Sequence, residues 1–158
     1  MKIINPNTAA EVADVRHLML EYALSMGLDL AYQQYDKELA DLPGRYASPT
    51  GWLLLAKCGG AAAGCVALRD IGDNICEMKR MYVPAEFRRR GIGRLLAEAI
   101  IKKGAELGYS AMRLDTRASF VEAIALYRSL GFQEINAYEY NPSPDAMYME
   151  LSLQDTSS

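Results

Sequence analysis

The sequence predicts an α/β (α+β) fold, with a mixed, mostly antiparallel central sheet of about six to seven strands flanked by four helices. Two observations support this prediction. Three strand-like runs within residues 52–83 are joined by tight turns, which is typical of an antiparallel meander. A helical stretch at 92–107 then lies between two strand-like runs, so the strands on either side of it should be parallel.

The N-terminal part predicts a short strand followed by two helices. The strand covers residues 2–5 and is ended by a proline. Thr8 and Glu11 have the spacing of a capping box, and apolar residues then recur at helical spacing to about Met26. Residues 28–39 carry a second helical pattern, which is followed by a loop rich in turn residues.

The strands of the meander are expected at 52–58, 61–71 and 75–83. Gly59-Gly60 is a two-residue hairpin signal, and Gly72-Asp73-Asn74 predicts a second tight turn. The sequence therefore predicts that these three strands are neighbours in the sheet.

The C-terminal half predicts two more helices and three more strands. The helix at 92–107 has an apolar stripe and is closed by a glycine. A strand is expected at 111–116 and a helix at 120–130, and the last two strands are expected at 132–135 and 146–153.

Composition limits the class of protein. With 158 residues, 51% hydrophobic and 23% charged, the chain suits a single domain that spans residues 1–158. A net charge of −3 and a sequence pI of about 5.2 argue against a nucleic-acid partner. No apolar run reaches the roughly 20 residues of a membrane span, and the start lacks a signal-peptide core, so we expect a cytoplasmic protein. A homodimer stays open.

The three cysteines and one histidine do not suggest a metal site. Cys58, Cys65 and Cys76 lack metal-ligand spacing, and two of them lie in apolar strand-like runs. His17 lies in the first helix, where a surface or capping position is expected. We predict buried reduced thiols and no bound metal.

The segment between the third meander strand and the following helix has the features of a pyrophosphate site. Gly91 and Gly93 allow a sharp turn and a close approach of the backbone to an anion. The first turn of the helix offers unpaired N–H groups and the positive end of its dipole. Four arginines, which can pair with phosphate through two parallel bonds, add positive charge: Arg88, Arg89, Arg90 and Arg94.

Other glycine loops fit this segment less well. A P-loop requires a Gly-Lys-Ser/Thr sequence that is absent here, and a dinucleotide fingerprint requires a third glycine where Leu96 stands. The remaining pattern, Arg88-x-x-Gly91-x-Gly93 between strand and helix, resembles the acyl-CoA loop of the GNAT superfamily of N-acetyltransferases.

A second element downstream carries the same resemblance. The segment AIALYRSLGF, residues 123–132, is similar to the late GNAT helix that contains a Leu-Tyr pair and ends in Gly-Phe. The acetyl-CoA loop would then be 81–96 and the late helix signature 120–132. Phe120 departs from the pattern, because that position often holds an asparagine that contacts the cofactor.

The resemblance implies transfer of an acetyl group from acetyl-CoA to an amine, by direct attack in a ternary complex. It also implies that the strand before the loop separates from its parallel neighbour and pairs with the pantetheine arm of CoA. The residues that the resemblance assigns to cofactor binding are Met81, Tyr82, Val83, Arg88, Arg89, Arg90, Gly91, Ile92, Gly93 and Arg94.

Two residues are candidates for catalysis. The resemblance places the Tyr127 hydroxyl near the cofactor sulfur as general acid; alternatively, Tyr127 is a core aromatic of its helix. Glu77 is the candidate base, because it lies in an apolar strand where burial would raise its carboxyl pKa. The alternative is that Glu77 pairs with Lys79 or Arg69.

The acceptor is less readable. Tyr138 and Tyr140 lie in a loop that, with Tyr46, could form an aromatic wall for a small-molecule amine or an amino-acid-like acceptor. A protein N-terminus or lysine is the alternative acceptor. A domain that binds or senses acyl-CoA without turnover is the alternative from another functional class.

Overall fold

The computed structural model describes residues 1–27 and 35–154. One seven-stranded sheet has the strand order β1-β2-β3-β4-β5-β7-β6. Its strands are β1 (Lys2–Ile4), β2 (Trp52–Cys58), β3 (Ala61–Asp70), β4 (Ile75–Tyr82), β5 (Ala111–Arg117), β6 (Gln133–Ile135) and β7 (Ala146–Ser152). The α-helices of the described residues are α1 (Ala9–Ser25), α2 (Tyr35–Asp41), α3 (Ile92–Glu106) and α4 (Val121–Ser129).

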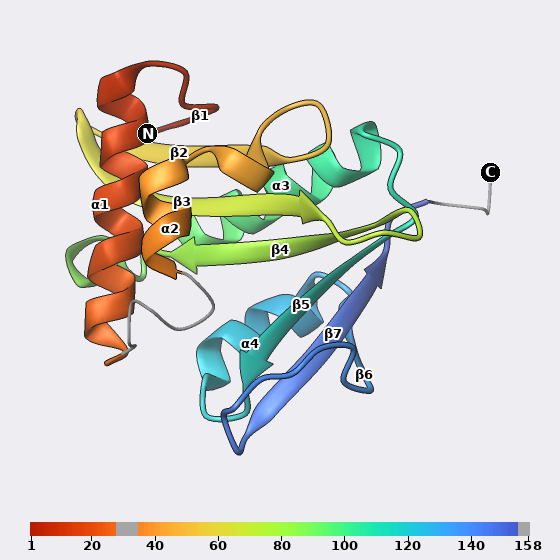
Figure 1. Ribbon diagram of the computed structural model, residues 1–158. Helices are drawn as coiled ribbons and strands as arrows, with labels where there is room; N and C mark the ends of the chain where they lie inside the picture. Colours follow the sequence, from red (N-terminus) through yellow and green to blue (C-terminus); the bar gives the residue numbers. More distant parts are fainter. Residues whose placement is uncertain (28–34, 155–158) are drawn as a thin grey trace.

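The predicted sheet and its flanking helices are confirmed. Strands β1 to β4 pair antiparallel in sequence order, and β4 pairs with β5 in parallel across α3. Helices α1 and α2 cover one face of the sheet, whereas α3 and α4 lie on the other (Figure 1). The described part of the second helix, α2, ends at Asp41, two residues after the predicted end, and residues 28–34, where the prediction begins, lie outside the described part of the chain.

The N-terminal helix forms for the predicted reason. The hydroxyl of Thr8 accepts a hydrogen bond from the Glu11 amide at 3.1 Å, and the Glu11 carboxylate accepts one from the Thr8 amide at 3.3 Å. This capping box satisfies two N–H groups that the first turn leaves unpaired. Helix α1 then packs its apolar side, which includes Val15, Leu18 and Met19, against the sheet.

Alternation along the strands gives the sheet a core on each face. On β2, Leu53 and Leu55 face α1 and α2, whereas Leu54 and Ala56 face α3. A strand with apolar side chains on both faces reads as a continuous run rather than an alternation. This explains why residues 52–58 are almost entirely apolar although the strand pairs antiparallel.

Strands β4 and β5 separate soon after they begin to pair. Their ladder comprises Ile75–Ala111, Cys76–Met112 and Glu77–Arg113, and the strands then diverge (Figure 1). On its other edge β4 stays paired with β3, where the register slips between Lys79 and Tyr82 and Arg80 adopts a left-handed φ of 61°. Such a bulge bends the strand.

Among the described residues, no helix is both long and apolar enough to cross a membrane.

A glycine allows β3, β4 and α3 to approach each other where β4 bends away. A Cβ on Gly64 would lie 2.9 Å from Leu96 Cδ1 and 3.0 Å from the carbonyl oxygen of Tyr82. We expect Gly64→Val to lower the free energy of unfolding by about 1–3 kcal/mol, because overpacked cores cost that much. Ala61→Val, at an exposed position of the same strand, is the control for chemical denaturation. Equal stability of the Gly64 variant and wild type would contradict this packing.

Candidate active site

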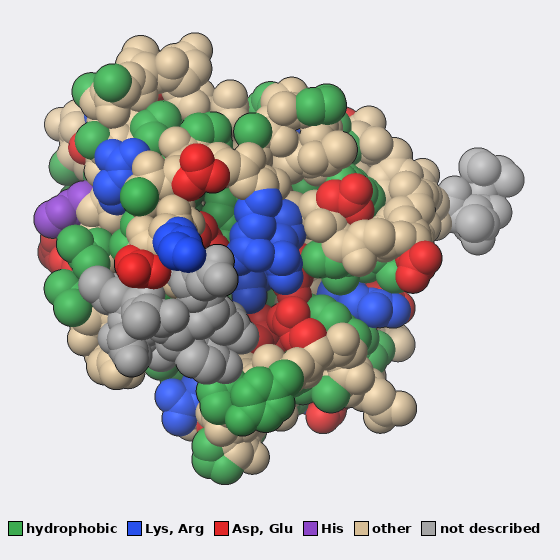
Figure 2. All heavy atoms as spheres, in the orientation of Figure 1, with side chains coloured by type: hydrophobic (Ala, Val, Ile, Leu, Met, Phe, Trp, Pro, Cys, Tyr) green, Lys and Arg blue, Asp and Glu red, His purple; other side chains and the backbone are tan. Residues whose placement is uncertain are grey.

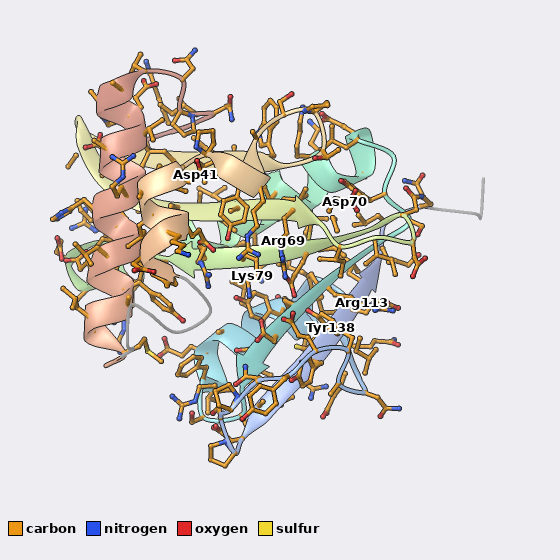
Figure 3. All side chains as sticks on the ribbon, in the orientation of Figure 1. Asp41, Arg69, Asp70, Lys79, Arg113 and Tyr138 are labelled. Carbon is orange, nitrogen blue, oxygen red and sulfur yellow. The ribbon has the colours of Figure 1, made fainter. Side chains whose placement is uncertain are left out.

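Charged side chains gather where β4 and β5 separate. In the space-filling view, Lys and Arg side chains lie over the middle of this face with acidic side chains directly beside them (Figure 2). Arg69 and Lys79 come from β3 and β4, and Tyr138 reaches the same region from the loop before β7 (Figure 3). Two adjacent strands and a loop that is distant from them in the sequence therefore contribute to one cluster.

Glu77 lies at the centre of this cluster and is fully buried. Its carboxylate accepts hydrogen bonds from Arg69 Nε at 2.7 Å and from the Tyr138 hydroxyl at 2.6 Å, and Lys79 Nζ lies 4.0 Å away. Burial alone would raise the pKa of Glu77, but Lys79, the Tyr138 hydrogen bond and Arg69 together lower it. The expectation of a raised pKa is therefore wrong, and the alternative pairing with Arg69 and Lys79 is confirmed.

The neighbouring carboxylate, Glu139, behaves in the opposite way. Burial and the negative charge of Glu77 raise the pKa of Glu139 to about 7. Arg69 Nη2 lies 3.6 Å from its Oε2, too far to compensate fully. The carboxylate oxygens of Glu77, Asp115 and Glu139 lie within 4.8 Å of one another, a spacing that a cation could bridge. Arg69 and Lys79 already supply positive charge to this group.

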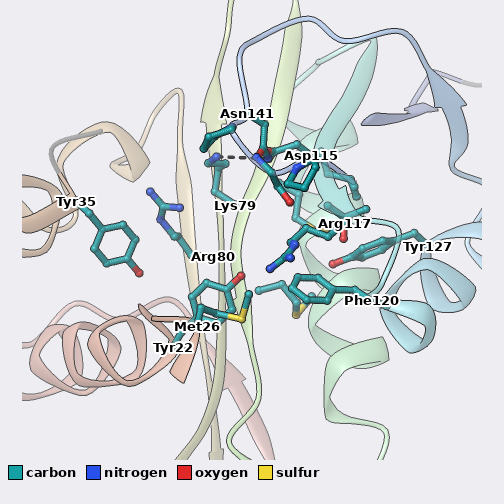
Figure 4. Close-up of a pocket in the computed structure, with 18 residues that line it drawn as sticks. Tyr22, Met26, Tyr35, Lys79, Arg80, Asp115, Arg117, Phe120, Tyr127 and Asn141 are labelled. Atoms are coloured by element: carbon teal, nitrogen blue, oxygen red, sulfur yellow. Dashed lines mark hydrogen bonds and ion pairs between the residues drawn. The ribbon is translucent and has the colours of Figure 1, made fainter. Parts of the chain in front are cut away.

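A pocket of about 510 Å³ opens beside the cluster, between β4 with α1 on one side and β5 with α4 on the other (Figure 4). Residues 141–144 also line it. Its wall combines aromatic side chains, among them Tyr22, Phe120 and Tyr127, with charged groups. The pocket therefore offers both apolar and charged surface, and polar groups that fix the orientation of a ligand are typical of small-molecule sites.

Tyr127 lines this pocket from α4 and is 7% exposed. Its ring packs edge-on against Phe132, with centroids 5.8 Å apart, so the core fixes its position. Among the described residues its hydroxyl has no hydrogen-bond partner, and it points toward the middle of the pocket (Figure 4). Burial raises the pKa of Tyr127, so the hydroxyl keeps its proton at neutral pH.

The predicted anion loop has the expected geometry at the start of α3. Gly91 is the N-cap residue with a left-handed φ of 80°, and Arg89 is also left-handed at 64°. Added atoms at Gly91 would have no heavy atom within 4 Å, so the space in front of the helix is open. Arg88 Nε donates to the Val83 carbonyl at 2.9 Å, and Arg94 Nη2 donates to Ser129 Oγ at 2.6 Å. Ile92 is buried.

The edge of β4 that faces β5 lacks a strand partner beyond Glu77 among the described residues. Beyond Glu77 no ladder joins β4 to β5 in the described residues, and Met81 lies in the separated part of β4 and lines the pocket. Val83 follows directly, and Tyr82 packs edge-on against Tyr22 of α1, with ring centroids 5.4 Å apart. The edge therefore leads from the pocket toward the N-terminus of α3.

The three tyrosines predicted to contact the acceptor lie in different surroundings. Tyr46 is 1% exposed in the core beneath α1 and α2. Tyr140 is 75% exposed on the surface. Tyr138 packs edge-on against Tyr148 and donates to Glu77, so it touches the charged cluster. None of the three lines the pocket.

Several pocket residues were not among the predicted site residues. Lys79, Asp115 and Arg117 all line the pocket, together with Asn141. A signal existed for two of them: Arg113, Asp115 and Arg117 alternate along β5 and share one face of that strand. Because this strand was predicted parallel to β4, its polar face could have been assigned to the site.

The raised pKa of Glu139 predicts a pH-dependent stability. An unfolded glutamate releases its proton near pH 4.5, whereas folded Glu139 keeps it to about pH 7. The folded state therefore binds more protons in this interval, and stability falls as the pH rises from 4.5 to 7. We expect Glu139→Gln to gain about 1–2 kcal/mol relative to wild type between pH 5 and pH 8, a value reduced for solvent screening.

Chemical denaturation at both pH values measures this gain. Glu134→Gln, which changes an exposed side chain on β6, should keep the pH dependence of wild type. A gain for Glu139→Gln that is the same at pH 5 and pH 8 would contradict the raised pKa.

Comparison with known proteins agrees with this geometry. A model of the acetyltransferase (GNAT) family matches residues 13–132. An uncharacterized N-acetyltransferase of Schizosaccharomyces pombe is 41% identical over 90% of this chain and 89% of its own length. N-acetylaspartate synthetase of Rattus norvegicus is 35% identical over 87% of this chain, but this match covers 46% of that protein.

Solved structures share the fold. The putative acetyltransferase yncA of Salmonella typhimurium, solved with its cofactor acetyl-CoA, superposes with a TM-score of 0.77 over 100% of this chain and 96% of its own, at 19% identity. The family model covers well over half of the chain, and the S. pombe relative matches nearly its whole length. The chain therefore belongs to the GNAT family of acetyltransferases, and it is an enzyme of the N-acetyltransferase type.

Proposed function

We propose that this N-acetyltransferase transfers the acetyl group of acetyl-CoA to a small-molecule, amino-acid-like amine by direct attack in a ternary complex. The observation that carries the proposal is the Tyr127 hydroxyl, which has no hydrogen-bond partner among the described residues and lies inside a pocket that opens where β4 and β5 separate. Pantetheine, the acceptor and a proton donor can meet at this point.

The cofactor is held by main-chain groups and by the arginine loop. The edge of β4 at Met81, and the amide of Val83 directly after β4, pair with the amides of pantetheine as a strand would. The pyrophosphate binds the N–H groups of the first turn of α3, at Ile92, Gly93 and Arg94, where the helix dipole also favours negative charge. Tyr82 supports the edge from the core, and Arg88, Arg89 and Arg90 supply positive charge at the loop.

The reaction requires three proton transfers. The acceptor ammonium loses one proton to solvent, and its neutral nitrogen forms a bond to the thioester carbonyl carbon. The carbon–sulfur bond then breaks, the departing thiolate takes a proton from the Tyr127 hydroxyl, and a second proton from the new amide nitrogen restores the phenol. A raised pKa suits this role, because the phenol stays protonated until the thiolate forms.

Glu77 acts in this proposal through its neighbours. Its carboxylate is fully buried and holds Arg69, Tyr138 and Lys79, so it orients the Lys79 ammonium at the pocket wall. This surrounding favours a positioning role over direct removal of the acceptor proton. Replacement of Glu77 by glutamine tests the two roles. If Glu77 is the base, the pH profile of kcat/KM has an acidic limb in wild type that the variant lacks. If Glu77 only positions its neighbours, the acidic limb is the same in both proteins.

A small acceptor is favoured by the relatives, which include an enzyme whose name describes acetylation of an amino acid, aspartate. Residues 141–144 line the pocket where such an acceptor would bind. A protein N-terminus or lysine is the alternative acceptor. A non-catalytic acyl-CoA sensor would have no use for the Tyr127 hydroxyl, which has no hydrogen-bond partner among the described residues.

The loop that contains Arg88, Arg89 and Arg90 generates a prediction about CoA binding. Gly91→Val should weaken CoA binding by more than about tenfold, because its side chain fills the open space in front of α3. Gly108→Val is the matched control: it also has a positive φ and open surroundings, but it lies at the other end of α3. Titration calorimetry with CoA measures both variants. An equal loss of CoA affinity in the two variants would indicate general strain on α3 and would refute the pyrophosphate site at the start of this helix.

The second prediction concerns turnover. Tyr127→Phe should lower kcat about 100-fold or more while the Kd of CoA stays unchanged, because only the proton donor is lost. Free-thiol release from acetyl-CoA across a panel of amines measures the rate. Tyr109→Phe, which removes a tyrosine hydroxyl that donates to Thr50 far from the pocket, is the control. Tight CoA binding by wild type with no thiol release on any amine would support the sensor instead.

A further inference from the structure

The polar face of β5 enters the pocket only beyond its ladder with β4. The ladder ends at the Glu77–Arg113 pair, and Asp115 and Arg117 follow at alternate positions on the same face of β5. Both line the pocket, and both point inward from the side of Tyr127 (Figure 4). One acidic and one basic side chain therefore lie two residues apart beside the expected reaction centre.

Asp115 keeps capacity for another donor. Its Oδ2 accepts a hydrogen bond from Asn141 Nδ2 at 2.8 Å, and Lys79 Nζ lies 3.6 Å from Oδ1. A carboxylate offers about four lone-pair positions, so these two contacts do not saturate it. Solvent reaches 18% of the side chain, which leaves room for an ammonium group.

Arg117 has unused donors directed to the same space. Its Nε lies 3.2 Å from Asp145 Oδ1, and its guanidinium stacks over the Phe120 ring, with Cζ 5.4 Å from the centroid. The two terminal nitrogens of Arg117 form no hydrogen bond or ion pair with a described residue. The stacking fixes the plane of the guanidinium, and a fixed plane with free terminal N–H groups suits a carboxylate.

The other cations of the pocket are already committed. Arg80 donates to Glu38 from Nε at 2.7 Å and from Nη2 at 2.9 Å, and its guanidinium stacks on Tyr35. Lys79 lies between Asp115 and Glu77. Arg117 is therefore the cation of the described pocket wall with the most donors free for a ligand.

We propose that the acceptor is an amine that carries its own carboxylate, such as a free amino acid, with Asp115 receiving its ammonium group and Arg117 its carboxylate. This inference rests on the proposed acetyl transfer and names the acceptor class. Asp115 holds the nitrogen on the Tyr127 side, facing the thioester, and Arg117 fixes the other end of the molecule. A peptide N-terminus or a diamine would bring no carboxylate of its own to the terminal nitrogens of Arg117.

The test compares free amino acids with the amides of the same amino acids, which keep the amine but lose the negative charge. Thiol release from acetyl-CoA gives kcat/KM for each compound. Wild type should prefer the acids by about tenfold or more, because a site built for a charged partner rejects the analogue that lacks it. Arg117→Gln should remove most of this preference by slowing the acids alone.

Asp115→Asn should slow acids and amides alike, because both present an ammonium group. Arg128→Gln is the matched control: this arginine lies on α4 and pairs with Glu134 at 3.9 Å, outside the pocket. It should keep the acid-to-amide ratio of wild type. Calorimetry with CoA shows whether each variant retains its folded cofactor site.

The outcomes separate the two levels of the proposal. Thiol release that favours amides or diamines, or an acid preference that survives Arg117→Gln, would overturn the acceptor assignment while acetyl transfer stands. An Asp115→Asn variant as fast as wild type would remove its role at the ammonium. No release with any amine would refute the proposed function itself.

Discussion

The separation of β4 from β5 after three paired residues is the constraint on which the rest of the site depends. A parallel pair that continued would bury the β4 edge and close the pocket. The bulge at Arg80 bends β4, and Glu38 anchors the bent strand through two hydrogen bonds to the same arginine. The buried ion pair with Glu38 thus stabilises Arg80 in its left-handed backbone conformation. Gly64 permits the close packing of β3 against the start of α3.

The charged cluster connects this opening to chemistry. The cost of burying the charge of Glu77 is offset by Arg69, Lys79 and the Tyr138 hydroxyl. The negative charge of Glu77 in turn raises the pKa of Glu139. Lys79 lies between Glu77 and Asp115, so it connects the buried carboxylate to the wall of the pocket. Two carboxylates with opposite pKa shifts thus lie side by side: close cationic and hydrogen-bonding partners outweigh burial at Glu77, whereas burial and the charge of Glu77 prevail at Glu139.

Most of the fold and the glycine turn at the start of α3 could be predicted from the sequence, because they depend on local signals. The Thr8 capping box, the Gly59-Gly60 turn and the apolar stripe of α3 each act within a few residues. The pocket wall depends on contacts between distant segments, such as Asn141 with Asp115, which local patterns do not reveal. For the same reason Tyr46 could not be recognised as a core residue, and the sequence left open whether Glu77 is a base or pairs with Arg69 and Lys79.

The central claim is that the free edge of β4 and the first turn of α3 hold the cofactor through main-chain groups. Amide hydrogen exchange followed by NMR, with and without CoA, tests it most directly. The account predicts that the amides of the separated part of β4, around Met81 and Val83, and those of Gly93 and Arg94 become protected when CoA binds, whereas amides of β1 do not change. Saturating CoA that leaves the β4 and α3 amides as exchangeable as before would contradict it.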